Sequence, residues 1–207
     1  MKSLFFTILH GAALLASGVQ AEEISGLERA IRELPAKFVA DIPLEDRALL
    51  LRSLLAGSGD ERLDLKKGFL NWYSDSPEAP RSSSMLYMQE YRKADGGVVV
   101  LTHMPKPYAD GSTPRANQTF VFEQRKDQWT DITSEVLPKG IDLTNHFQPR
   151  WGSSVVEVSP YVHTKRNDGR GFAWTIGPRV AELHWNGRVL TMGKRGKDSA
   201  SAEEQTR

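Results

Sequence analysis

Histidines have the most versatile chemistry in this sequence, because near neutral pH they can act as general bases or as metal ligands. Four of the five lie beyond the apolar N-terminus: His103, His146, His163 and His184. No two of these lie within five residues of each other, so the chain has no local metal-ligand motif. We therefore predict no metal site and no cofactor.

The sequence also lacks a motif for nucleophilic catalysis. The sequence has no Gly-x-Ser-x-Gly turn to expose a serine, and it has no cysteine. We therefore predict no catalytic residues. The alternative is a hydrolase whose site is assembled from dispersed histidines and carboxylates. It requires at least two of the four histidines to approach each other, or a carboxylate, in a cleft.

Aromatic side chains with arginines nearby are common at recognition surfaces. A loop rich in proline and glycine, residues 105–116, carries Tyr108 and Arg115, and the second half of the chain carries His163 and Arg170 around an Asn-Asp-Gly turn. We predict these four as binding residues, since recognition side chains often lie on loops. The alternative is that the aromatic residues simply pack across strands.

The N-terminus has the plan of a secretory signal peptide over residues 1–21. Lys2 precedes an apolar run, which ends in small residues at Ala21. We expect cleavage there, export to the periplasm or the extracellular space, and no membrane span afterwards. Loss of Lys2 leaves 26 basic and 26 acidic residues, so the mature chain lacks the basic excess of a nucleic-acid binder. With no cysteine it forms no disulfide.

The mature chain divides by pattern into a helical lead-in, two strand-rich halves and a tail. The lead-in, 22–67, has helical leucine spacing over 25–34 and 44–55, with Ser25 as the first cap and Gly57 as the second stop. The leucines of the second helix predict good cover by the sheet. Residues 194–207 have no large apolar side chain and are predicted to be disordered.

The strands form two predicted antiparallel meanders of about four strands each, over 68–134 and 154–193. Turn signals at Asp95-Gly96 and Asn186-Gly187 mark hairpins. Between the meanders, the connector 135–153 is expected to carry a short helical turn near 143–147. The fold class is α+β, mainly β, with the helices packed on the sheet. The meanders are expected to be half-propeller-like or one continuous twisted sheet, and the sequence leaves open whether they form one sheet or two.

A resemblance adds to this interpretation. The chain contains Lys93-Ala94-Asp95-Gly96 and, further on, Trp129-Thr130-Asp131-Ile132-Thr133 followed by Leu137-Pro138. In this order, after a helical start and an aromatic strand, they resemble a group of uncharacterised secreted bacterial β-rich proteins with K-x-D-G and W-x-D-V-T strand motifs. The likeness covers about residues 25–138 and implies a bacterial envelope or extracellular setting, with no activity attached.

Together these observations predict a non-enzymatic binding or interaction module of the cell envelope, whose partner is a protein or an envelope polymer. Two alternatives stay open: the hydrolase described above, and a purely structural envelope component. A structural component would have no concave aromatic or charged groove.

Overall fold

The computed structural model describes residues 24–57, 62–74, 84–105, 118–126, 128–165 and 172–193. The predicted leader and tail, and most of the loop 105–116, lie outside this set. The described elements in chain order are α1 (Gly26–Glu33), η1 (Ala36–Phe38), η2 (Leu44–Asp46), α2 (Arg47–Ala56), β1 (Arg62–Asp64), β2 (Phe69–Ser74), β3 (Ser84–Arg92), β4 (Val98–His103), β5 (Thr119–Arg125), β6 (Gln128–Asp131), α3 (Thr133–Val136), β7 (His146–Pro149), β8 (Val155–Ser159), β9 (Tyr161–Lys165), β10 (Phe172–Ile176), β11 (Ala181–Trp185) and β12 (Leu190–Met192).

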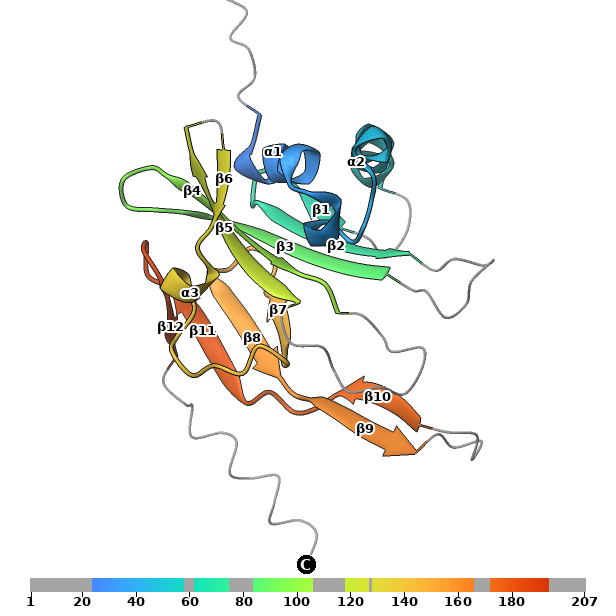
Figure 1. Ribbon diagram of the computed structural model, residues 1–207, viewed down its shortest axis with the longest axis vertical. Coiled ribbons are helices and arrows are strands. Elements are labelled where there is room, and N and C mark those ends of the chain that lie inside the picture. The colour runs from blue at the N-terminus through green and yellow to red at the C-terminus, as the bar shows by residue number, and fades with distance from the viewer. Residues whose placement is uncertain are drawn as a thin grey trace, which may run out of the picture.

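The molecule is mainly β and antiparallel, as predicted. A six-stranded sheet in the order β1-β2-β3-β4-β5-β6 lies in the middle, with α1 and α2 over one face and a four-stranded sheet, β12-β11-β8-β7, beneath the other (Figure 1). The hairpin β9–β10 extends from the four-stranded sheet as a separate two-stranded sheet. The two halves of the chain thus lie in separate sheets and not in one continuous sheet. The half-propeller comparison stays a prediction.

Alternation along the strands gives the six-stranded sheet two buried faces. Leu86, Met88 and Val100 point toward the helices and join one core cluster. Val99 and Leu101 point toward the four-stranded sheet and join a second cluster with Phe147, Val156 and Leu183. Each face buries its own apolar set, so the register of the sheet is fixed from both sides.

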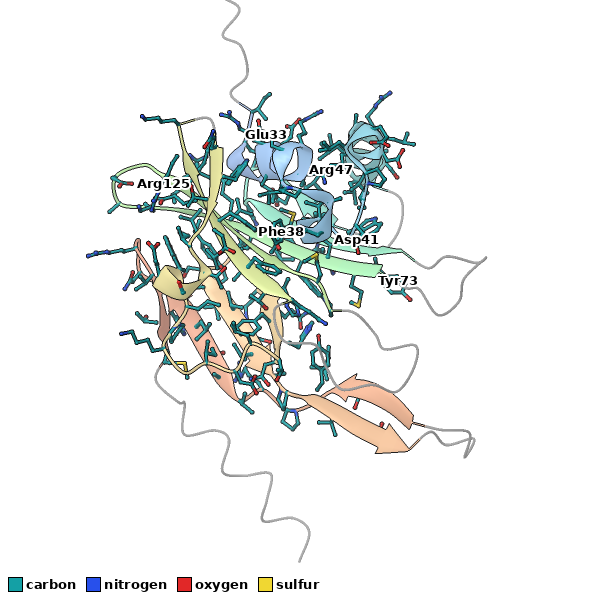
Figure 2. The ribbon with its side chains drawn as sticks, in the orientation of Figure 1. Glu33, Phe38, Asp41, Arg47, Tyr73 and Arg125 are labelled. Carbon is teal, nitrogen blue, oxygen red and sulfur yellow. The ribbon has the colours of Figure 1, made fainter. Side chains whose placement is uncertain are left out.

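The helical lead-in forms largely as predicted. Ser25 Oγ accepts a hydrogen bond from the Glu28 backbone N–H at 3.1 Å and caps α1. The buried Arg47 donates to the carbonyls of Ile31, Leu34 and Ile42, and so satisfies carbonyl groups at the end of α1 and in the loop that follows. Figure 2 shows Arg47 between α1 and α2.

The prediction that the sheet covers the second helix well was wrong. Leu51 and Leu54 are buried, but Leu44, Leu49 and Leu55 are at least 60 % exposed. The helix meets the rest of the molecule along one narrow stripe, whereas its leucines lie on more than that stripe. Helical spacing alone does not limit how much of a face a neighbour covers.

The connector prediction also needs correction. The expected helical turn near residues 143–147 is instead a turn followed by β7, whose residues His146–Pro149 pair with Ser159–Val156 of β8. The short helix of this region is α3, ten residues earlier. An available strand edge on β8 decided the conformation of residues 146–149, because pairing there buries Phe147 completely.

The two predicted tight turns meet in space. Gly96 and Gly187 both have positive φ, of 86° and 91°, which glycine adopts without steric cost. The Ala94 N–H donates to the Gly187 carbonyl at 3.1 Å, and Trp185 Nε1 donates to the Arg92 carbonyl at 2.8 Å. The hairpin turn of each half therefore holds the other half in place.

Candidate functional site

The four binding residues predicted from the sequence remain untested by the structure. Tyr108, Arg115 and Arg170 lie outside the described residues, and so does the side chain of His163. Their role stays a prediction.

Two of the four histidines meet between the sheets. His103, on β4, is completely buried, and its Nε2 lies 3.1 Å from Nδ1 of His146, on β7. His103 Nδ1 lies 2.8 Å from Thr119 Oγ1, and His146 Nδ1 lies 3.1 Å from the Tyr161 hydroxyl. Sequence reasoning missed this pair because the residues are 43 positions apart, on strands of different sheets.

A backbone donor decides which histidine nitrogens carry protons. The Phe147 N–H can only donate, and it points at His103 Nε2 from 3.3 Å. His103 Nε2 therefore accepts, so in the neutral ring the proton sits on Nδ1 and is donated to Thr119 Oγ1. His146 in turn donates from Nδ1 to His103, which leaves His146 Nε2 as a buried acceptor without a hydrogen-bond partner among the described residues.

Burial keeps both rings neutral. It holds the pKa of His103 well below its usual value, with a smaller contribution from His146, because a charged imidazole loses its hydration in the core. Burial likewise lowers the pKa of His146 to about 4, partly opposed by the side chain of Gln148. At neutral pH the pair is a polar joint between two sheets and carries no charge.

This geometry is poorly suited to catalysis. His103 donates to the Thr119 hydroxyl and so cannot also take its proton through Nδ1. Among the described residues, no three histidine or carboxylate side chains are grouped closely enough to hold a metal ion. His184, the remaining histidine whose side chain is described, is partly exposed, and its Nε2 lies 3.6 Å from the Glu182 carboxylate. The two histidines do approach each other, as the hydrolase alternative requires, but they do so in the core.

A groove of about 860 Å³ opens beside this joint. We call it the connector groove, because the residues after α3 form one wall and the start of β5 forms the other. Its apolar lining is Phe120, Leu137, Pro138, Ile141 and Leu143, and its polar lining is Thr119, Asp131, Thr133, Ser134 and Lys139. Apolar walls with a few polar groups are typical of ligand sites.

The polar side of the connector groove is preorganised. Asp131 Oδ1 accepts hydrogen bonds from the backbone N–H and the hydroxyl of Thr133, at 2.9 and 2.6 Å. The Thr133 hydroxyl in turn accepts a hydrogen bond from the Val121 N–H of β5 at 2.9 Å, which ties the start of α3 to the sheet. Ser134 and Lys139 are exposed at the rim of the groove. The sequence marked these residues only as part of a strand motif and a connector.

A second pocket, of about 630 Å³, lies where the two turns meet. Within it the Glu123 carboxylate accepts from Lys93 Nζ and from Arg125 Nε, both at 2.5 Å. These two hydrogen bonds, Lys93 first, lower the pKa of Glu123. The charges of Lys93, Glu123 and Arg125 are paired with one another. This pocket is therefore better explained as a contact that holds the two halves together than as a ligand site.

No protein-family profile, curated protein or solved structure matches this chain.

Proposed function

We propose that this protein is a non-enzymatic binding module of the cell envelope, exported by its leader, and that the connector groove is where it holds a protein or polymer partner. The observation that carries the proposal is the groove itself: a large apolar concavity with a fixed hydrogen-bonded side and two exposed polar residues at its rim.

The groove suits a binding role because its walls come from rigid elements. Phe120 and Thr119 belong to a strand paired with β4, and Leu137 follows directly on α3. An apolar segment of a partner would displace water from Ile141 and Leu143, and polar groups on it would meet Ser134, Lys139 and the carboxylate of Asp131. Such a site loses little conformational entropy on binding.

The histidine pair gives no support to the hydrolase alternative, because the one hydroxyl bonded to His103 in the described part of the chain, that of Thr119, receives a proton from it. A purely structural component would need no groove of this size. Envelope location rests on the leader pattern and the resemblance alone. The protein or polymer partner is to be identified by the test below.

The test is photo-crosslinking in cells from within the groove. A photoreactive residue at Ser134 or Lys139, both at the rim, should capture one discrete partner in the envelope fraction. The same residue at Thr175, exposed on β10, is the matched control and should not. Purified partner should then bind the Ile141→Asp variant at least tenfold more weakly, because a carboxylate would have to be desolvated on the apolar wall.

Absence of a crosslink from both rim positions would contradict the proposal. So would equal capture from Thr175, since that would show contact without use of the groove. A partner that binds Ile141→Asp as tightly as the unaltered protein would show that the groove is not the site.

A further inference from the structure

The outer face of α2 is unusually apolar. Leu49 is 65 % and Leu55 60 % exposed on α2, whose Leu51 and Leu54 pack against the core, and Leu44 of the preceding η2 is 60 % exposed. Single exposed leucines are common on soluble proteins. Three within twelve residues, on η2 and α2, leave an unusual amount of apolar side chain in water. Exposed apolar side chains that gather on one part of a surface mark interaction sites.

This surface continues into a shallow groove of about 440 Å³ at the edge strand β1. Leu55 lines it together with Leu63, Leu65 and the indole of Trp151. Trp151 comes from the loop between β7 and β8 and is 44 % exposed. Its Nε1 donates to Asp64 Oδ2 at 3.2 Å, which fixes the ring at the surface.

Two cations lie against that indole, and a third lines the same groove. Arg62 Cζ lies 4.4 Å and Lys67 Nζ 3.7 Å from the centre of the ring, and Lys66 lines the same groove. None of the three forms an ion pair with another residue of the described part of the chain, and Asp64 is the only acidic residue among those that line the groove there. By contrast, Arg150 and Arg179, in loops beside the four-stranded sheet, are both paired with Glu157 and Glu182.

We propose that the outer face of α2 and the Trp151 groove form a docking surface for a lipid bilayer that carries anionic headgroups. The exposed leucines would enter the apolar boundary of the bilayer, the indole would lie at the level of the headgroups, and Arg62, Lys66 and Lys67 would meet lipid phosphates. An anionic polysaccharide would satisfy the cations and leave the three leucines in water, so the observations favour lipid.

The contact is peripheral. No helix among the described residues has both the length and the apolarity to cross a bilayer. The inference rests on the envelope location in the proposed function, and it uses a different part of the molecule. In Figure 1, α2 and the α3 region that borders the connector groove lie on opposite sides of the view, so a protein docked through α2 leaves that groove accessible.

The test is sedimentation of the purified exported protein with vesicles. It should pellet with vesicles of phosphatidylglycerol and phosphatidylcholine, pellet far less with phosphatidylcholine alone, and be released by salt. Replacing Lys66 and Lys67 by glutamate should lower partitioning at least tenfold, since each basic residue near an anionic surface contributes measurably. Leu49→Ser with Leu55→Ser should also lower it. All four side chains are exposed, so these variants should keep the unaltered melting curve.

The matched control replaces two exposed apolar residues elsewhere, Val180→Ser with Met192→Ser, and should leave partitioning unchanged. Absence of binding to anionic vesicles, or partitioning that ignores the leucine and lysine variants, would overturn the inference. Binding to the soluble polyanion dextran sulfate that depends on the lysines and not on the leucines would overturn it in favour of a polymer. A crosslink from the groove rim without vesicle binding would support the proposed function and overturn the lipid-docking inference. Vesicle binding without a rim crosslink would support lipid docking and contradict the proposed function.

Discussion

The interface between the two sheets is fastened in opposite ways at its two ends. At the turn end, Lys93, Glu123 and Arg125 form charged hydrogen bonds, and Tyr91 stacks on Trp185 with ring centres 5.1 Å apart. At the histidine end, two neutral rings share a 3.1 Å hydrogen bond, and one nitrogen has no partner among the described residues.

The difference follows from access to water. The Lys93 side chain is 24 % exposed, so the ion pairs keep part of their hydration. His103 is completely buried, and a charge there would lose all of it. Charged groups thus hold the partly exposed end of the interface, and uncharged polar groups hold its buried end. The following changes should distinguish the contributions of the two ends to stability, from the largest effect to the smallest.

Acid should weaken the histidine end most. The pKa of His146 is 6.5 in the unfolded chain and about 4 in the folded protein. The folded state is therefore favoured above pH 6.5, and this stabilisation is lost as the pH falls toward the folded-state pKa. This difference corresponds to about 3 kcal/mol for His146 alone. Urea unfolding, followed from neutral pH to about pH 4, measures it. A His146→Phe variant should lose the share of the slope that His146 contributes and keep the share from His103, whose pKa burial also lowers. A flat profile in the unaltered protein would contradict this explanation.

Removing the carboxylate at the turn end should cost less. Glu123→Gln leaves Lys93 and Arg125 without their acceptor, at a cost of about 2 kcal/mol at neutral pH. Glu135→Gln is the matched control, because that exposed carboxylate lies 4.0 Å from Arg125 and should contribute almost nothing. Equal losses in the two variants would mean that Glu123 acts only through overall charge.

The hydrogen bond from the Trp185 indole to the Arg92 carbonyl should contribute about 1 kcal/mol to the free energy of unfolding. Trp185→Phe removes the donor to the Arg92 carbonyl and keeps an aromatic ring against Tyr91. Thermal unfolding should show a small fall in melting temperature with cooperativity unchanged. Two separate transitions would instead show that this single contact couples the halves.

The smallest effect is expected from His146→Phe at neutral pH. It removes the contacts of Nδ1 with His103 and with the Tyr161 hydroxyl, and with them one unpartnered buried nitrogen. The loss and the gain largely offset, so the change should stay within about 1 kcal/mol. A large loss measured by urea unfolding would mean that Nε2 has a partner outside the described residues.

Local patterns predicted the elements that they encode directly. Ser25 caps α1, and Asp95-Gly96 and Asn186-Gly187 form the turns that their glycines favour. The mainly β, antiparallel class followed from the same signals. The helical turn predicted near residues 143–147 was wrong, because the distant edge of β8 makes the chain extended from His146 on.

The site was harder to predict. His103 and His146 are brought together by the packing of one sheet on another, and no spacing in the chain encodes that distance. The connector groove joins the start of β5 to residues some twenty positions later, after a helix and a turn. The exposure of Leu49 and Leu55 depends on how much of α2 is left uncovered, which only the assembled fold decides.

The most direct test of the claim that this protein binds rather than catalyses is nitrogen NMR of the histidine rings across pH. We predict that His103 carries its proton on Nδ1, hydrogen-bonded to Thr119, and that neither His103 nor His146 becomes charged until the pH falls well below 6.5. A proton on Nε2 of His103, with a titration near neutral pH, would leave Nδ1 free to accept the Thr119 proton. That result would contradict the account and make a catalytic role the better explanation.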